Sequence, residues 1–231
     1  MTMLDTILSS PLFGISLSIL CFELGVLICK KANTQLANPL LTSGLMIILL
    51  LSVCGIPFDT YNNGARFITM FLSPCTAVLA INIYSNLDTI KKYLLPILAG
   101  TAAAAAASMG SVFLLCRLFG LDDQVLLSLL PKSVTTAIAL PLASMTGGID
   151  AILVTATTLT GALCAMTAPM MIRLFRFRDP VAIGIATGCA GHGIATASAI
   201  RMGPVQGATS GIAIGMSGII TVLIYAILFP V

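Results

Sequence analysis

The stretch Leu130-Pro131-Lys132-Ser133-Val134-Thr135-Thr136 interrupts an otherwise apolar segment that runs from residue 124 to residue 146. Pro131 lacks a backbone donor and disfavours helix at the residue before it, and Lys132 places a charge near the middle of the segment. A second interruption, Gly188-Cys189-Ala190-Gly191-His192-Gly193, brings three glycines and the only histidine into the apolar segment 181–200. Each interruption predicts a half-helix, an unwound turn and a second half-helix.

The composition around these interruptions is that of a membrane protein. Of the 231 residues, 58% are hydrophobic and 8% are charged, whereas soluble domains carry about 25% charge. A mean hydropathy of +1.09 is spread over the whole chain. These values exclude a soluble enzyme, a nucleic-acid-binding protein and a secreted disulfide scaffold. The net charge of +3 comes from basic residues that fall mostly in short gaps between apolar runs, as in membrane proteins generally.

Eight apolar stretches approach the length of about 20 residues that a helix needs to cross a hydrocarbon core of about 30 Å. They cover residues 11–29, 39–56, 67–83, 93–116, 124–146, 151–172, 181–200 and 208–229. Helices are expected because backbone groups in lipid must be satisfied within their own segment. The connections, including residues 57–66, are predicted to be short turns.

The short connections predict one integral membrane domain over residues 1–231. Within it, residues 1–120 are expected to form a scaffold, and residues 121–231 to hold two repeat units and the substrate site. The two interruptions correspond at an offset of sixty residues, which places Lys132 over His192 and predicts a repeat of 124–175 and 184–229.

The loop charges bear on how these repeat units cross the membrane. If all eight segments crossed, Arg173, Arg176 and Arg178 would lie opposite Lys91 and Lys92, against the positive-inside tendency. If both interrupted segments are re-entrant, the arginines return to the cytoplasmic side and the two units enter from opposite faces. The predicted fold is therefore an all-α polytopic membrane protein with about six full spans and two broken or re-entrant elements in an inverted repeat.

The interruptions also carry the candidate substrate-binding residues, which are Lys132, Ser133, Thr135, Thr136, Gly191, His192, Gly193 and Thr196. A lysine in the bilayer centre costs about 2.5–3.5 kcal/mol on insertion scales unless it meets a partner or water. Lys132 is therefore a candidate anion ligand, the alternative being a lysine that reaches the interface. The hydroxyls after it lie where a half-helix begins, and they either help to bind a carboxylate or cap that helix.

Two groups, one of them already a ligand candidate, are candidates for proton coupling. His192 lies between two glycines and fits either a ligand or proton site or a structural core histidine. Glu23 lies in the middle of the first segment and could instead pair across the bundle or be protonated at a helix contact. No second histidine or suitably spaced carboxylate accompanies His192, so neither a metal nor a cofactor is expected. The sequence contains no HExxH, GxSxG or phosphate-binding loop, so we predict no enzyme.

The two interruptions resemble the signature sequences of the LrgB/CidB family, and Asn38-Pro39-Leu40-Leu41 resembles a third signature. The resemblance covers nearly the whole chain in order and size. The second stretch departs from the family pattern at Cys189, Gly191 and Ala195, which leaves His192 and Thr196 as the stronger ligand candidates there.

The resemblance implies two kinds of function. Some members of this family transport small carboxylates such as glycolate, glycerate or pyruvate. Others are holin- or antiholin-like modulators of murein hydrolase export and autolysis, usually paired with a small LrgA/CidA-type membrane protein. We therefore expect a monocarboxylate transporter in the bacterial cytoplasmic membrane, in contact with lipid, working with such a partner and forming a homo-oligomer, with a dimer as the first guess. The alternatives are a holin-like pore or regulator and a non-conducting subunit that acts through the partner.

Overall fold

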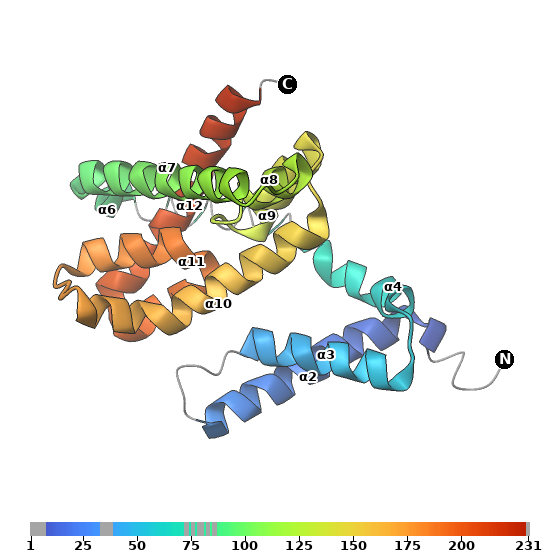
Figure 1. Cartoon of the computed structure of the whole chain (residues 1–231). Helices are drawn as coiled ribbons and strands as arrows, with labels where there is room; N and C mark the ends of the chain where they lie inside the picture. The colour runs from blue at the N-terminus through green and yellow to red at the C-terminus, as the bar shows by residue number, and fades with distance from the viewer. Residues whose placement is uncertain are drawn as a thin grey trace. The chain divides into compact units, whose positions relative to one another are not determined.

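The computed structural model describes residues 8–32, 39–71, 74, 77, 81, 84 and 87–229, and every regular element in these ranges is a helix (Figure 1). Contacts divide the chain into two compact units, Met1–Pro74 and Cys75–Val231. Five of the described helices are long and apolar enough to cross a membrane: α2, α7, α10, α11 and α12. The predicted polytopic helical membrane protein is confirmed, whereas the predicted division of roles at residue 120 stays a prediction.

The first unit contains α2 (Pro11–Ala32), α3 (Pro39–Cys54) and α4 (Phe58–Thr69). Both α3 and α4 pack on α2. Gly14 of α2 lies against Gly64 of α4 so closely that a Cβ on either glycine would overlap the other helix. The predicted segment 67–83 lies mostly outside the described residues.

The helix α4 corrects one prediction, since residues 57–66 were expected to form a turn. Its asparagines and charged residues resemble a loop when composition alone is considered. The close glycine contact with α2 and a 2.8 Å hydrogen bond between Ser18 and Tyr61 hold it as a helix instead.

The second unit contains α6 (Leu87–Lys92), α7 (Leu94–Leu118), α8 (Asp123–Leu129), α9 (Thr136–Thr146), α10 (Asp150–Leu174), α11 (Pro180–Met202) and α12 (Pro204–Leu228). Figure 1 shows α7, α10 and α12 as long helices of this unit. At about 1.5 Å per residue, each of these 25-residue helices is long enough to cross a hydrocarbon core.

The helices α8 and α9 form a hairpin, which we call the first hairpin (residues 123–146). Near its start, the carbonyl of Leu127 accepts a 3.1 Å hydrogen bond from the hydroxyl of Tyr225 on α12, and the Thr146 side chain at its end bonds to the same Tyr225. Between these points, Val134 lines a cavity with Ser217 of α12. Ser217 is about 12 Å from Tyr225 along α12. The first hairpin therefore runs from the C-terminal end of α12 toward the middle of that helix and back to the same end.

The helix α11 also doubles back, at His192, whose φ of 38° and ψ of −135° are not helical. We call residues 180–202 the second hairpin, with a first arm before His192 and a second arm after it. Along the first arm, a Cβ on Gly184 would lie 2.6 Å from the Gln206 carbonyl, whereas Gly188 lies farther along α12, against Ser210 and Ala213. The second arm returns along the same helix, with Thr196 bonded to Ser210 and Ile200 packed on Gly207.

The two hairpins therefore approach the middle of α12 from opposite ends, as the predicted inverted repeat requires. The end at which the second hairpin enters also holds the basic residues Lys91, Lys92, Arg173, Arg176, Arg178 and Arg201. The opposite end holds Arg117 together with Asp122, Asp123 and Asp150. A basic end of this kind is typical of the cytoplasmic side of a membrane protein, so entry of the second hairpin from the cytoplasmic face stays a prediction.

Candidate functional site

The tips of the two hairpins meet in the middle of the second unit. Val134 of the first hairpin and Cys189 of the second line one small cavity of about 10 Å³, together with Ser217 of α12. This volume is close to the space of a single water molecule. The hydroxyl of Ser133 forms a hydrogen bond with the hydroxyl of Ser108 on α7, and the side chain of Cys189 forms a hydrogen bond with that of Ser217. The two interrupted stretches that the sequence singled out are thus brought together.

Lys132 is half-buried at the tip of the first hairpin. Within the described ranges, the one ion pair is the exposed pair of Arg117 and Asp123 at 2.9 Å, so no described carboxylate neutralises Lys132. Its ammonium lies within electrostatic range of His192 on the other hairpin. A cation without a partner inside a membrane protein favours an anionic ligand.

The start of α9 lies directly after Lys132. Thr135 is the N-cap residue in an extended conformation, with φ −60° and ψ 145°, and its side chain makes no capping hydrogen bond. Its hydroxyl is buried and has no partner. The capping alternative for Thr135 is therefore not realised, and the positive end of the α9 dipole faces the tip.

His192 is held between the second hairpin and α10. Only 4% of its surface is exposed, and Nε2 has no hydrogen-bond partner. The ring interacts with the backbone of Thr157, and Gly191 packs against Cys164 of the same helix. The imidazole is therefore held by α10, and its Nε2 is left without a hydrogen-bond partner.

The remaining predicted residues have mixed surroundings. Thr196 donates a 2.8 Å hydrogen bond to the carbonyl of His192 and pairs with Ser210 at 2.7 Å, so its hydroxyl is occupied in stabilising the second hairpin. Gly193 borders open space, and Thr136 is half-buried. Glu23 lies in the first unit with an exposed side chain, and its role in proton coupling stays a prediction.

Sequence reasoning missed the contributions of α7, α10 and α12 to this site. Thr157 is completely buried beside His192, and its hydroxyl has no partner. Ser108 and Ser217 contact the two tips. These hydroxyls lie within uninterrupted apolar segments, and their only signal in the sequence is a polar residue in the middle of a span. In the described part of the chain, no cluster of three His, Cys, Asp or Glu side chains could hold a metal ion.

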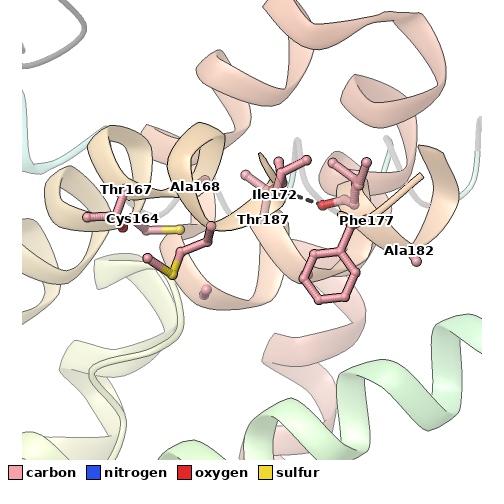
Figure 2. A pocket seen from close by; sticks show the side chains of 11 residues that line it. Cys164, Thr167, Ala168, Ile172, Phe177, Ala182 and Thr187 are labelled. Atoms are coloured by element: carbon pink, nitrogen blue, oxygen red, sulfur yellow. Dashed lines mark hydrogen bonds between the residues drawn. The ribbon is translucent and has the colours of Figure 1, made fainter. Parts of the chain in front are cut away.

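An apolar groove of about 410 Å³ leads toward this site between α10 and the first arm of the second hairpin (Figure 2). Phe177 and Ala182 line its outer part, and Cys164 and Ala190 line its inner part next to Gly191. Few polar groups reach its surface, and Thr187 uses its hydroxyl in a 2.7 Å hydrogen bond to the Ile183 carbonyl. The groove therefore borders the polar site without offering a carboxylate ligand.

The fold and site define a polytopic helical membrane protein in which two helical hairpins approach the middle of α12 from opposite ends, with Lys132 on one and His192 on the other. The chain belongs to the LrgB-like family, whose model matches residues 18–231. It is 35% identical over 222 residues to the antiholin-like protein LrgB of Bacillus cereus (strain B4264), with 96% of each chain covered. The antiholin-like protein LrgB of Bacillus anthracis (strain CDC 684 / NRRL 3495) matches with the same identity and coverage. No solved structure matches the chain. The family and the long apolar helices identify a multi-pass protein of the bacterial membrane.

The meeting of the two tips can be tested by cross-linking. In a background that retains Cys189 and lacks the other six native cysteines, Val134→Cys should form a disulfide or a short bifunctional cross-link with Cys189, because both side chains line the same small cavity. The expected result is a protein that migrates faster on a non-reducing gel. Val205→Cys is the control, since it lies about 18 Å along α12 from Ser217, the partner of Cys189. Equal cross-linking at positions 134 and 205 would contradict the arrangement.

Proposed function

We propose that this protein transports small monocarboxylates, of the pyruvate, glycolate or glycerate class, across the bacterial cytoplasmic membrane. The observation that carries this proposal is Lys132, a half-buried cation that no described carboxylate neutralises, at the point where two broken helices meet. Transporters with inverted repeats commonly bind anionic substrate groups at the N-termini of half-helices near the midplane. The start of α9 and the start of the second arm after His192 provide two such N-termini.

In the proposed site, each predicted residue has a part that follows from its surroundings. Lys132 and the first turn of α9, with Thr135 and Thr136, receive the carboxylate. His192 offers Nε2 from the second hairpin, and Gly191 and Gly193 leave room for the ligand to approach the backbone. Ser133 and Thr196 support these groups through their bonds to Ser108 and Ser210. Because the hairpins enter from opposite ends, movement of one at a time would expose the site to one face at a time.

A second candidate function comes from the relatives, which are named antiholin-like proteins. A regulator of this kind would act on a pore or on a partner protein, and it would not need to bind a small carboxylate. An LrgA/CidA-like partner and a homo-oligomer, with a dimer as the first guess, are parts of the proposal that fit either function.

Uptake into proteoliposomes separates the two functions. The protein, reconstituted alone and together with an LrgA/CidA-like partner, should take up labelled glycolate, glycerate or pyruvate with saturation, because a carrier has a limited number of sites. Empty liposomes are the control. Unsaturable leakage of uncharged dyes without carboxylate selectivity would indicate a pore. The absence of carboxylate uptake in both preparations would contradict the transport proposal.

A further inference from the structure

Thr157 differs from three other buried threonines of the second unit in its hydrogen bonding. Its side chain is 0% exposed, and its hydroxyl has no hydrogen-bond partner. By contrast, Thr101, Thr187 and Thr209 each donate to the carbonyl four residues earlier, at 2.6, 2.7 and 2.8 Å. Leaving a buried hydroxyl unpaired costs about 1–3 kcal/mol. Thr157 is therefore available to a group outside its own helix.

The ring of His192 lies over the same turn of α10 and is also incompletely bonded. Nε2 has no partner, whereas the ring interacts with the backbone of Thr157, so Nδ1 makes that contact. The N–H of Thr157 belongs to the hydrogen-bonded interior of α10, which leaves its carbonyl, with a second lone pair, as the acceptor. Nδ1 consequently carries the hydrogen, and Nε2 is left as an acceptor.

Gly161 permits this contact between the ring and the helix backbone. It follows Thr157 by one helical turn, and a Cβ at this position would lie 2.9 Å from Cε1 of His192. Any larger residue would push the imidazole away from the Thr157 carbonyl.

Lys132 of the first hairpin lies near this imidazole. The ammonium of Lys132 lies within electrostatic range of His192. The contact between the second hairpin and α10 thus contains an unpartnered acceptor nitrogen on His192 and an unpartnered hydroxyl on Thr157, with Lys132 within electrostatic range of the histidine.

We propose that Thr157 and His192 bind the hydroxyl group of a 2-hydroxy monocarboxylate whose carboxylate is bound by Lys132, an inference that rests on the proposed function. A hydroxyl group can donate to Nε2 and accept from Thr157 at once. A 2-oxo acid can only accept and leaves Nε2 unpaired, and an unsubstituted acid leaves both groups unpaired. Sites built to hydrogen-bond a substrate hydroxyl discriminate against analogues that lack it. We expect glycolate to be preferred over acetate, and lactate over pyruvate, by about 10- to 100-fold in KM.

The test replaces the hydroxyl of Thr157 while keeping the shape of its side chain. In the full-length protein in proteoliposomes, Thr157→Val should lower the ratio of the acetate KM to the glycolate KM several-fold, and the preference that remains should come from the hydrogen bond to Nε2 of His192. Thr157→Ser, which retains a hydroxyl, should restore most of the preference. Thr155→Val is the matched control on the same helix, because Thr155 is exposed and already bonds to the Ala151 carbonyl at 2.8 Å. It should keep the wild-type ratio.

Two outcomes separate this inference from the proposed function. Saturable uptake of glycolate and acetate with equal KM, or an unchanged ratio in a folded Thr157→Val protein, overturns the role of Thr157 while transport itself stands. Uptake of none of the four acids by the wild-type protein overturns the proposed function instead. Thermal unfolding of each variant shows whether a lost preference accompanies a folded protein.

Discussion

Replacing Lys132 by glutamine is expected to lower carboxylate uptake at low substrate concentration by about 100-fold. Removing one partner of a desolvated charge pair costs about 2–5 kcal/mol, and every 1.4 kcal/mol is a factor of ten. The loss should appear chiefly in KM, since the proposed role of the ammonium is to bind the substrate carboxylate. Lys132→Arg is expected to transport poorly as well, because a planar guanidinium does not replace a compact ammonium in a tight site. Initial rates of glycolate uptake in proteoliposomes measure both effects.

The protein should remain folded when Lys132 is changed. No described carboxylate pairs with this lysine, so glutamine leaves no described acid without its counter-charge, and Tm should not fall. Lys91→Gln is the matched control, since it makes the same change at an exposed lysine of α6. If Lys132→Gln takes up glycolate within about twofold of the wild-type rate, the anion site at the first hairpin is wrong.

The two hairpins could be predicted because their interruptions are local. Pro131 and the glycines around His192 break helical geometry by their own chemistry, whatever surrounds them. The loop arginines then favoured the interpretation that the interrupted segments are re-entrant, which stays a prediction. Together these signals placed Lys132 and His192 at corresponding positions of the predicted repeat. In the structure these two residues interact electrostatically, and the tips of the two hairpins line one cavity.

The part of the site on α10 could not be predicted, because it depends on which side of an ordinary helix faces inward. Thr155 and Thr157 are two residues apart in the same apolar segment, and the sequence gives no reason to prefer either. Packing decides between them: Thr155 is exposed and bonded to its own helix, whereas Thr157 is buried beneath His192. Packing also determines the surroundings of Thr196. It was predicted as a ligand, but its hydroxyl makes hydrogen bonds to the His192 carbonyl and to Ser210.

Close packing between helices was harder to predict from the sequence than the two interruptions. Gly184 and Gly188 have the four-residue spacing that lets two membrane helices approach closely, yet the sequence drew attention to Gly188 only as part of an interruption. In the structure, Gly188 lies against the backbone of α12: a Cβ there would overlap the Ser210 carbonyl and come within 3.0 Å of the Ser210 Cα and the Ala213 Cβ. Neither backbone atom can rotate away.

Adding a single methyl group at Gly188 should therefore disturb both the stability and the transport of this protein. Alanine normally stabilises a helix interior by about 0.5–1 kcal/mol relative to glycine, but the overlap with α12 forces the first arm of the second hairpin outward, and overpacking costs about 1–3 kcal/mol. We expect Gly188→Ala to lower Tm by about 5 °C and to reduce glycolate uptake, because the arm carries His192 at its end. Gly110→Ala in α7 is the control, since a Cβ there meets nothing within 4 Å, and its Tm should stay the same or rise. A Gly188→Ala protein as stable and as active as Gly110→Ala would show that the first arm does not pack on α12 in the way that the two-hairpin arrangement requires.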